Sequence, residues 1–115
     1  MLLCTCIMPI QPQPLPPTPD YPHWVYYARY NNTENWQTVR FQQLTDSRQA
    51  DWQVIQQWAK ELQVEFDGAE IMVTSVYPSK RWKPKVYEFA APSKGTMAKW
   101  KQRVPQARGI RIRHA

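Results

Sequence analysis

The sequence predicts an α+β fold, a two-layer β-β-α-β-β-α sandwich in which a mostly antiparallel four-stranded sheet carries two helices on one face. Three observations favour this class. Runs rich in aromatic and β-branched residues alternate with segments of helical spacing. The first two runs are separated by too few residues for a crossover helix. The chain has 115 residues, which suits one domain.

The stretch before the first predicted strand is rich in proline. Seven of the eleven prolines lie between Pro9 and Pro22, and each of them fixes φ and removes a backbone N–H donor. We therefore predict a disordered, proline-rich leader over 1–22, followed by a single α+β domain over 23–115 with a basic C-terminal half. The tract is more typical of a stiff tether than of a PxxP ligand, because no Arg or Lys flanks it to orient docking.

Two strands are predicted at the start of the domain. The runs "HWVYYARY" (23–30) and "WQTVRFQQL" (36–44) are rich in β-formers, and the turn-forming "NNTEN" between them indicates a hairpin. Period-two alternation places Trp24, Tyr26 and Tyr30 on one face of the first strand. We expect that face to contribute to the core.

The segment "TDSRQADWQVIQQWAKEL" changes to helical spacing. Asp46, with Gln49 three residues later, is the predicted N-cap of this helix. An apolar stripe at i, i+3, i+7 and i+10 predicts the face that packs on the sheet. The stripe consists of Trp52, Ile55, Ala59 and Leu62.

The second half repeats this order of elements. "AEIMVTSVY" is apolar on both faces, as in an interior strand, and "KVYEF" predicts a shorter strand. A second helix is expected from Ser93 or Thr96 to Val104, because Pro105 stops it. Its expected buried stripe is Met97, Trp100 and Val104. The final "GIRIRHA" alternates Ile with Arg, which is typical of an edge strand or an ordered tail.

The charge is divided unevenly along the chain. Residues 1–77 hold four basic and eight acidic residues, a net charge of −4, whereas residues 78–115 hold eleven basic residues and one acidic residue, a net charge of +10. Such asymmetry indicates a polyanionic partner. A basic segment that only keeps the protein in solution is the alternative.

The basic residues of the second half form the candidate nucleic-acid-binding surface. In "PSKRWKPK" the cations suit phosphate contacts, and Trp82 suits stacking on an unpaired base or packing against a neighbouring proline. The second helix and the tail extend the patch. The predicted site residues are Lys80, Arg81, Trp82, Lys83, Lys85, Lys99, Lys101, Arg103, Arg108, Arg111 and Arg113.

Two functions compete on this basis. The first is a non-enzymatic nucleic-acid-binding module, or accessory subunit, with little sequence specificity, because no recognition-helix motif is present; the sequence does not distinguish DNA from RNA. The second is an adaptor or inhibitor that docks on an acidic partner protein. The acidic first half can also pair with the basic half of another copy, which would give homo-oligomers. A membrane partner is not expected, because no exposed apolar helix face accompanies the cations.

Enzymatic activity and cofactors are not expected. His23 and His114 lie far apart in sequence, and no phosphate-binding loop or metal-binding motif is present. Cys4 and Cys6 are too closely spaced for an unstrained bridge and form no paired zinc motif, so no metal site is predicted. A core without a disulfide is typical of a reducing compartment, and we predict a cytoplasmic protein.

Overall fold

The structure, a computed structural model, confirms the α+β class and the predicted order of elements. It describes residues 9–12, 14–79 and 83–103. Four strands form one antiparallel sheet in the order β2-β1-β3-β4. The elements are β1 His23–Arg29, β2 Gln37–Gln43, α1 Arg48–Glu65, β3 Glu70–Val76, β4 Val86–Phe89 and α2 Lys94–Arg103. The predicted "GIRIRHA" strand and the last residue of the predicted stripe, Val104, lie outside the described residues.

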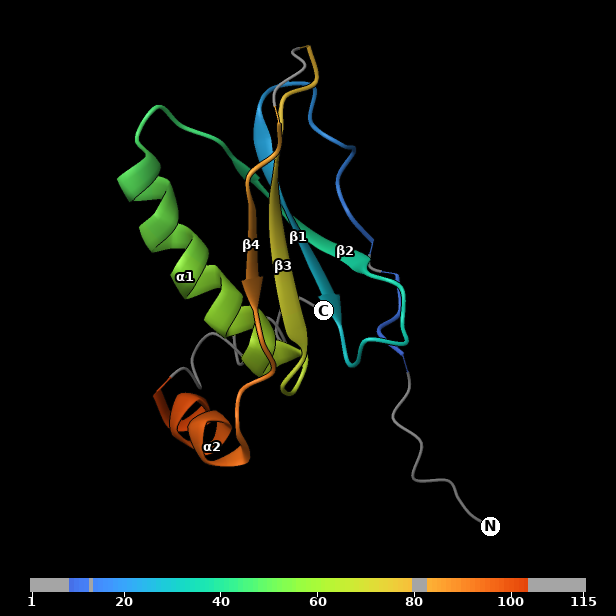
Figure 1. The fold of residues 1–115 in the computed structure, drawn as a ribbon, viewed down its shortest axis with the longest axis vertical. Coiled ribbons are helices and arrows are strands. Elements are labelled where there is room, and N and C mark those ends of the chain that lie inside the picture. Colours follow the sequence, from blue (N-terminus) through green and yellow to red (C-terminus); the bar gives the residue numbers. More distant parts are fainter. Residues whose placement is uncertain (1–8, 13, 80–82, 104–115) are drawn as a thin grey trace.

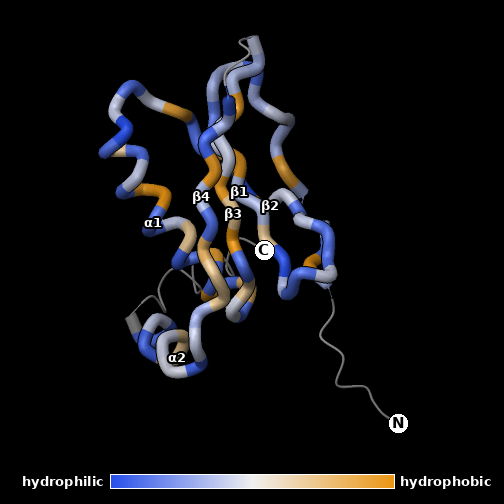
Figure 2. The backbone as a smooth tube through the Cα atoms, viewed as in Figure 1, coloured by the Kyte–Doolittle hydropathy of each residue, from blue (hydrophilic) through white to orange (hydrophobic). Residues whose placement is uncertain are grey.

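The helices and the sheet form two layers. α1 covers one face of the sheet, and α2 follows β4 and lies beside the C-terminal end of α1 (Figure 1). Hydrophobic positions concentrate on the strands, whereas α2 is largely hydrophilic (Figure 2). The core therefore lies between the sheet and α1.

The core is built from the alternating faces of the two central strands. Tyr26 of β1 lies opposite Val73 of β3, and Ala28 lies opposite Ile71, so these side chains share the face that α1 covers. Trp24, Tyr26 and Ala28 are buried as the predicted alternation requires, but His23 and Val25 of the other face are buried as well. Residues that are at most 1% exposed in this core are Tyr26, Ala28, Ile55, Ala59, Leu62, Ala69, Ile71 and Val73.

Part of the proline-rich segment contacts the folded body. Ile10 is 5% exposed and belongs to the same hydrophobic cluster as the core strands. Leu44 donates its backbone N–H to the carbonyl oxygen of Pro22 at 3.1 Å, which extends the pairing beyond the ends of β1 and β2. In Figure 1 the segment that precedes β1 runs on the side of the sheet away from α1.

The start of α1 corrects the predicted cap by one residue. Ser47, not Asp46, is the N-cap, and its hydroxyl accepts a hydrogen bond from the backbone N–H of Ala50 at 3.1 Å. Both residue types are good caps, so local sequence does not separate them. The choice is made by Asp51, which binds Thr45 and thereby fixes where the helix begins.

The buried stripe of α1 also differs from the prediction at its first position. Ile55, Ala59 and Leu62 are buried as predicted, but Trp52 is 37% exposed, and Asp51 is the buried residue at 3%. The spacing i, i+4, i+8 and i+11 from Asp51 follows the helical period. Trp52 is thereby turned toward β4.

The side-chain amide of Gln63 links the end of α1 to the start of β3 and to the end of β4. Asp67 and Gly68 adopt positive φ values of 48° and 88° and reverse the chain into β3. Gln63, which is 2% exposed, donates to the carbonyl oxygens of Ala69 at 3.1 Å and Ala90 at 2.9 Å. Gln63 thus places the end of β4 next to α1.

Tyr26 makes the stability of the fold sensitive to alkaline pH. Burial raises the pKa of its phenol above the usual value, and Asp51 adds to this whereas Arg40 opposes it. The unfolded state therefore releases its proton first, near pH 10. Above that pH the free energy of unfolding should fall by about 1.4 kcal/mol per pH unit. Tyr26→Phe should remove this contribution.

The check is denaturant unfolding of both proteins at about pH 9 and about pH 11. Tyr26→Phe loses the hydrogen bond to the Gln42 side chain, so we expect it to be less stable by about 1 kcal/mol at the lower pH. This difference in the free energy of unfolding between the two proteins should narrow at the higher pH. A gap that stays constant between the two conditions would contradict the role given to burial of the phenol.

Candidate binding site between α1 and β4

A cavity of about 250 Å³ opens where the first turns of α1 face β4. We call it the aromatic pocket. Its aromatic lining comes from β1, α1, the end of β3 and β4, and its charged lining comes mainly from the start of α1 and from the residue before β4. These residues are Trp24, Trp52, Tyr77 and Tyr87, with Asp46, Arg48, Asp51 and Lys85.

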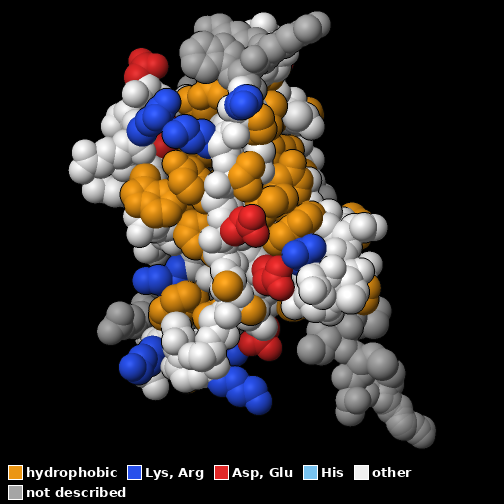
Figure 3. All heavy atoms as spheres, in the orientation of Figure 1, with side chains coloured by type: hydrophobic (Ala, Val, Ile, Leu, Met, Phe, Trp, Pro, Cys, Tyr) orange, Lys and Arg blue, Asp and Glu red, His pale blue; other side chains and the backbone are white. Residues whose placement is uncertain are grey.

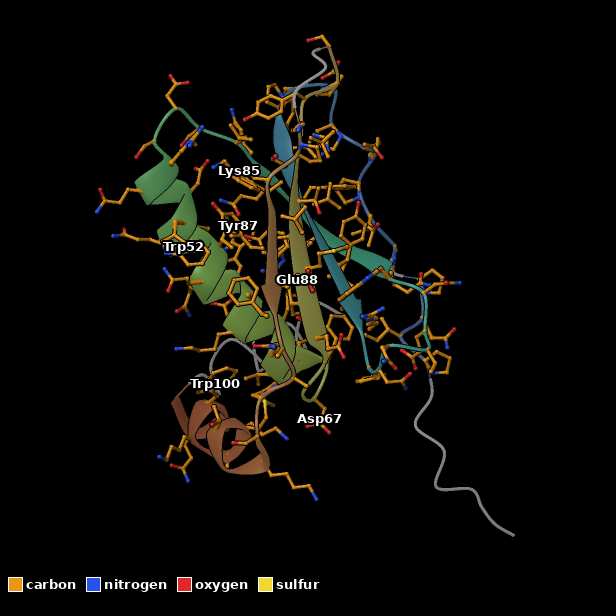
Figure 4. The ribbon with its side chains drawn as sticks, viewed as in Figure 1. Trp52, Asp67, Lys85, Tyr87, Glu88 and Trp100 are labelled. Atoms are coloured by element: carbon orange, nitrogen blue, oxygen red, sulfur yellow. The ribbon has the colours of Figure 1, made fainter. Side chains whose placement is uncertain are left out.

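The rings of the aromatic pocket contact one another in sequence. The ring centroids of Trp24 and Tyr87 are 5.9 Å apart, those of Tyr87 and Trp52 are 4.8 Å apart, and the rings of Trp52 and Phe89 stack at 6.1 Å. Figure 4 shows Trp52 and Tyr87 between α1 and β4, with Lys85 farther along toward the loop before β4. Because Trp52 is partly exposed, it offers a supported aromatic surface to a ligand.

Asp51 fixes the geometry beneath these rings. Its carboxylate accepts hydrogen bonds from the indole N–H of Trp24 at 3.0 Å, from the backbone N–H of Thr45 at 3.0 Å and from the Thr45 hydroxyl at 2.6 Å. A carboxylate in the first turn of a helix also interacts favourably with the helix dipole. Asp51 is therefore a structural carboxylate, which joins α1 to β1 and to the β2–α1 connection.

Lys85 is held at the mouth of the pocket by its backbone. Its N–H donates to the hydroxyl of Ser75 at 2.8 Å, and its carbonyl oxygen accepts from the N–H of Ser75 at 3.0 Å. Ser75 is 2% exposed, so this attachment is shielded from solvent. The side chain of Lys85 remains exposed, which leaves its ammonium group available to an anion.

Charges at the pocket favour an anion at one part of the rim. Lys85 and Arg48 contribute two cations, and Lys83 is exposed in the loop just before. Asp46 is exposed and opposes them. The carboxylate of Asp51 is buried and accepts hydrogen bonds from neutral donors, so it also keeps its negative charge, and only the exposed part of the rim near Lys85 favours an anion. In Figure 3, Lys and Arg side chains border a hydrophobic surface where α1 faces β4.

A second hollow of about 370 Å³ lies between α1 and α2. We call it the glutamine groove. Its lining residues are Gln53, Gln56, Gln57, Lys60, Gln63, Phe89 and Trp100. It adjoins the aromatic pocket, because Phe89 lines the groove and also stacks on Trp52. Lys60 places its ammonium nitrogen 5.5 Å from the centroid of the Trp100 ring.

The described residues of the predicted basic surface fall into two groups. Lys83 and Lys85 lie at the loop end of β4, and Lys99 is exposed on α2, at the opposite end of the molecule (Figures 1 and 4). Lys101 on α2 is paired with Asp67 at 2.7 Å. Arg103 is the last residue of α2, and its side chain lies outside the described part.

Six predicted site residues lie outside the described part of the chain, and the structure adds aromatic residues that were not predicted for the site. Lys80, Arg81, Trp82, Arg108, Arg111 and Arg113 lie outside the described residues. The structure adds aromatic residues that sequence analysis assigned only to the core or to a strand, namely Trp52, Tyr87 and Trp100. The helical period offered no signal for Trp52, because a stripe that starts at Asp51 fits the period as well as one that starts at Trp52.

Comparison with known proteins gives no family assignment. Within the described ranges, no three His, Cys, Asp or Glu side chains come together in a way that could hold a metal ion. None of the helices in those ranges has the length and apolar character needed to cross a membrane. No family model, no curated protein and no solved structure matches this chain.

Proposed function

We propose that the protein is a non-enzymatic module that binds single-stranded nucleic acid at the aromatic pocket. One observation carries the proposal: the partly exposed indole of Trp52 is supported by Tyr87 and lies in the same pocket as the ammonium group of Lys85. Stacking of a base on an aromatic ring is worth about 1–3 kcal/mol and tolerates every base. We therefore expect little sequence specificity.

The proposed contact mode joins stacking with phosphate binding. A base lies on the exposed part of the Trp52 ring, while Lys85 and Arg48 face the phosphates on either side of it. An unpaired base is required, because bases stacked within a duplex do not present their faces to a side chain. Lys83 and the predicted cations of the preceding loop would extend the phosphate contacts. A cytoplasmic setting belongs to the same proposal.

Substitutions at the rim should change affinity in opposite directions. Lys85→Ala should weaken binding of a labelled oligothymidylate and reduce the slope of log affinity against log salt by about 0.7, the value for one phosphate contact on a single strand. Asp46→Asn removes a negative charge that repels the phosphates, and it should tighten binding by about two- to fivefold. Fluorescence anisotropy over a series of salt concentrations measures both effects.

Lys94→Ala is the matched control, because Lys94 is also exposed but lies at the start of α2 away from the pocket. We expect a smaller salt effect there than at Lys85. Equal losses for the two lysines would indicate attraction by net charge alone. Absence of any salt-sensitive binding by the unsubstituted protein would refute the proposed function.

Docking on an acidic protein is the second candidate. It is favoured by the position of β4 at the edge of the sheet and by Val86, which is 49% exposed there. An edge strand can add a strand from a partner by backbone pairing. Co-purification of one defined protein that survives nuclease treatment, together with no oligonucleotide binding, would favour this candidate over the first.

A further inference from the structure

We propose that the glutamine groove is a second base-binding subsite, so that one nucleic-acid strand runs from Lys85 along α1 and β4 to α2. This inference rests on the proposed function and specifies the path of the ligand. It assigns a role to Trp100 and Lys60, which lie outside the aromatic pocket.

The lining of the groove suits a nucleic acid. Trp100 is partly buried and supplies an aromatic ring, and Lys60 lies against that ring. Gln53 and Gln56 are exposed, and their amides can donate to and accept from the edges of unpaired bases. No carboxylate is among the residues that line the groove, in contrast to the aromatic pocket. The nearby carboxylate of Glu61 accepts a hydrogen bond from Gln57 at 3.0 Å, so Lys60 is the only charged one of the described residues that line the groove itself.

The two hollows are neighbours, because one stacked pair of rings contributes one ring to each of them. Trp52 lines the aromatic pocket, Phe89 lines the glutamine groove, and their rings are inclined by only 23°. From Lys85 to Phe89 the chain advances four residues, or about 13 Å at the rise of a strand. At the spacing of about 3.4 Å per nucleotide in a fully stacked strand, that span holds at most about four nucleotides.

The two separated groups of lysines also fit this route. Lys85 lies at one end of it, and Lys99 is exposed on α2 at the other end. The space between them is lined mainly by rings and amides, with Lys60 as an intermediate cation. Phosphates of one strand would thus meet cations at both ends and along the way, although the lysines do not form one patch.

The experiment compares a trinucleotide with a dodecanucleotide of thymidylate for the full chain and two matched tryptophan variants. Trp100→Ala should weaken binding of the dodecanucleotide by about fivefold or more. Binding of the trinucleotide should stay unchanged. Trp36→Ala is the control, because Trp36 also packs against a cation, with the Arg29 guanidinium 4.1 Å from its ring centroid, but contributes to neither hollow. We expect no change at either length for this control.

Each outcome decides the question. A loss for the dodecanucleotide alone supports the subsite, and Lys60→Gln should then reproduce part of it without removing a ring. If Trp100→Ala loses affinity equally for both oligonucleotides, or loses none for either, the subsite is overturned while the aromatic pocket stays in place. Failure of the unsubstituted protein to bind either length overturns the proposed function itself. Thermal unfolding followed by circular dichroism identifies variants that have lost the fold, and Lys60→Gln then provides the test.

Discussion

Asp51→Ala is expected to lower the free energy of unfolding by about 3 kcal/mol. The substitution leaves the indole N–H of Trp24, which is buried, without its acceptor. It also removes the acceptor of two hydrogen bonds from Thr45, which set the start of α1. Hydrogen bonds to a charged group are worth more than neutral ones, and an unsatisfied buried donor carries the full cost of its desolvation. Denaturant unfolding measures the difference.

Asp46→Ala is the matched control for this prediction. It removes the same chemical group five residues earlier, but Asp46 is exposed and is not the helix cap. We expect a change within about 0.5 kcal/mol. Similar losses for the two variants would show that Asp51 contributes no more than a surface charge near the helix terminus.

Trp52→Ala is expected to weaken oligonucleotide binding by about tenfold or more, because base stacking on one ring is worth about 1–3 kcal/mol. The loss should persist at high salt, since stacking does not depend on charge. Anisotropy titrations at low and high salt measure it. Trp52 packs on Tyr87 and Phe89, so unfolding of the variant must be followed in parallel.

Val54→Ala provides a close comparison, because Val54 lies on the same helix and is also 37% exposed. Val54 comes two residues after Trp52, and two residues turn the helix by about 200°, so the two side chains point in nearly opposite directions. Unchanged affinity is expected for Val54→Ala. If both variants bind as well as the unsubstituted protein, Trp52 is only part of the packing between α1 and β4.

The strands could be predicted from sequence because their local signals agree with the tertiary environment. Trp24, Tyr26 and Ala28 alternate along β1, and the structure buries all three. The "DG" pair also satisfies the turn after α1 directly, since Gly68 takes a positive φ value that suits glycine. In these segments one register buries the apolar side chains, so few alternatives compete.

The beginning of α1 could not be predicted in the same way. Hydropathy favours Trp52 for the core and Asp51 for solvent, yet the structure does the reverse. The reason is tertiary: the indole N–H of Trp24, twenty-seven positions earlier, needs an acceptor, and Asp51 supplies it. A pattern within the helix contains no information on that distant donor.

The candidate site was only partly accessible to sequence reasoning. The bias in charge drew attention to Lys85, but it also grouped Lys85 with α2 lysines that lie at the other end of the fold. Lys101 illustrates the limit, because its partner Asp67 comes from the acidic half of the chain. The aromatic surface between the two groups depends on how α1 packs beside β4, which sequence spacing does not reveal.

In the binding mode that we propose, a single nucleic-acid strand lies along the rings between α1, β4 and α2. Indole N–H resonances of the tryptophans, observed by ¹H–¹⁵N correlation NMR during titration with a thymidylate dodecanucleotide, test it most directly. We expect the signals of Trp52 and Trp100 to shift together while that of Trp36 stays in place. Signals that remain unmoved at Trp52 and Trp100, or shifts confined to Trp36, would contradict it.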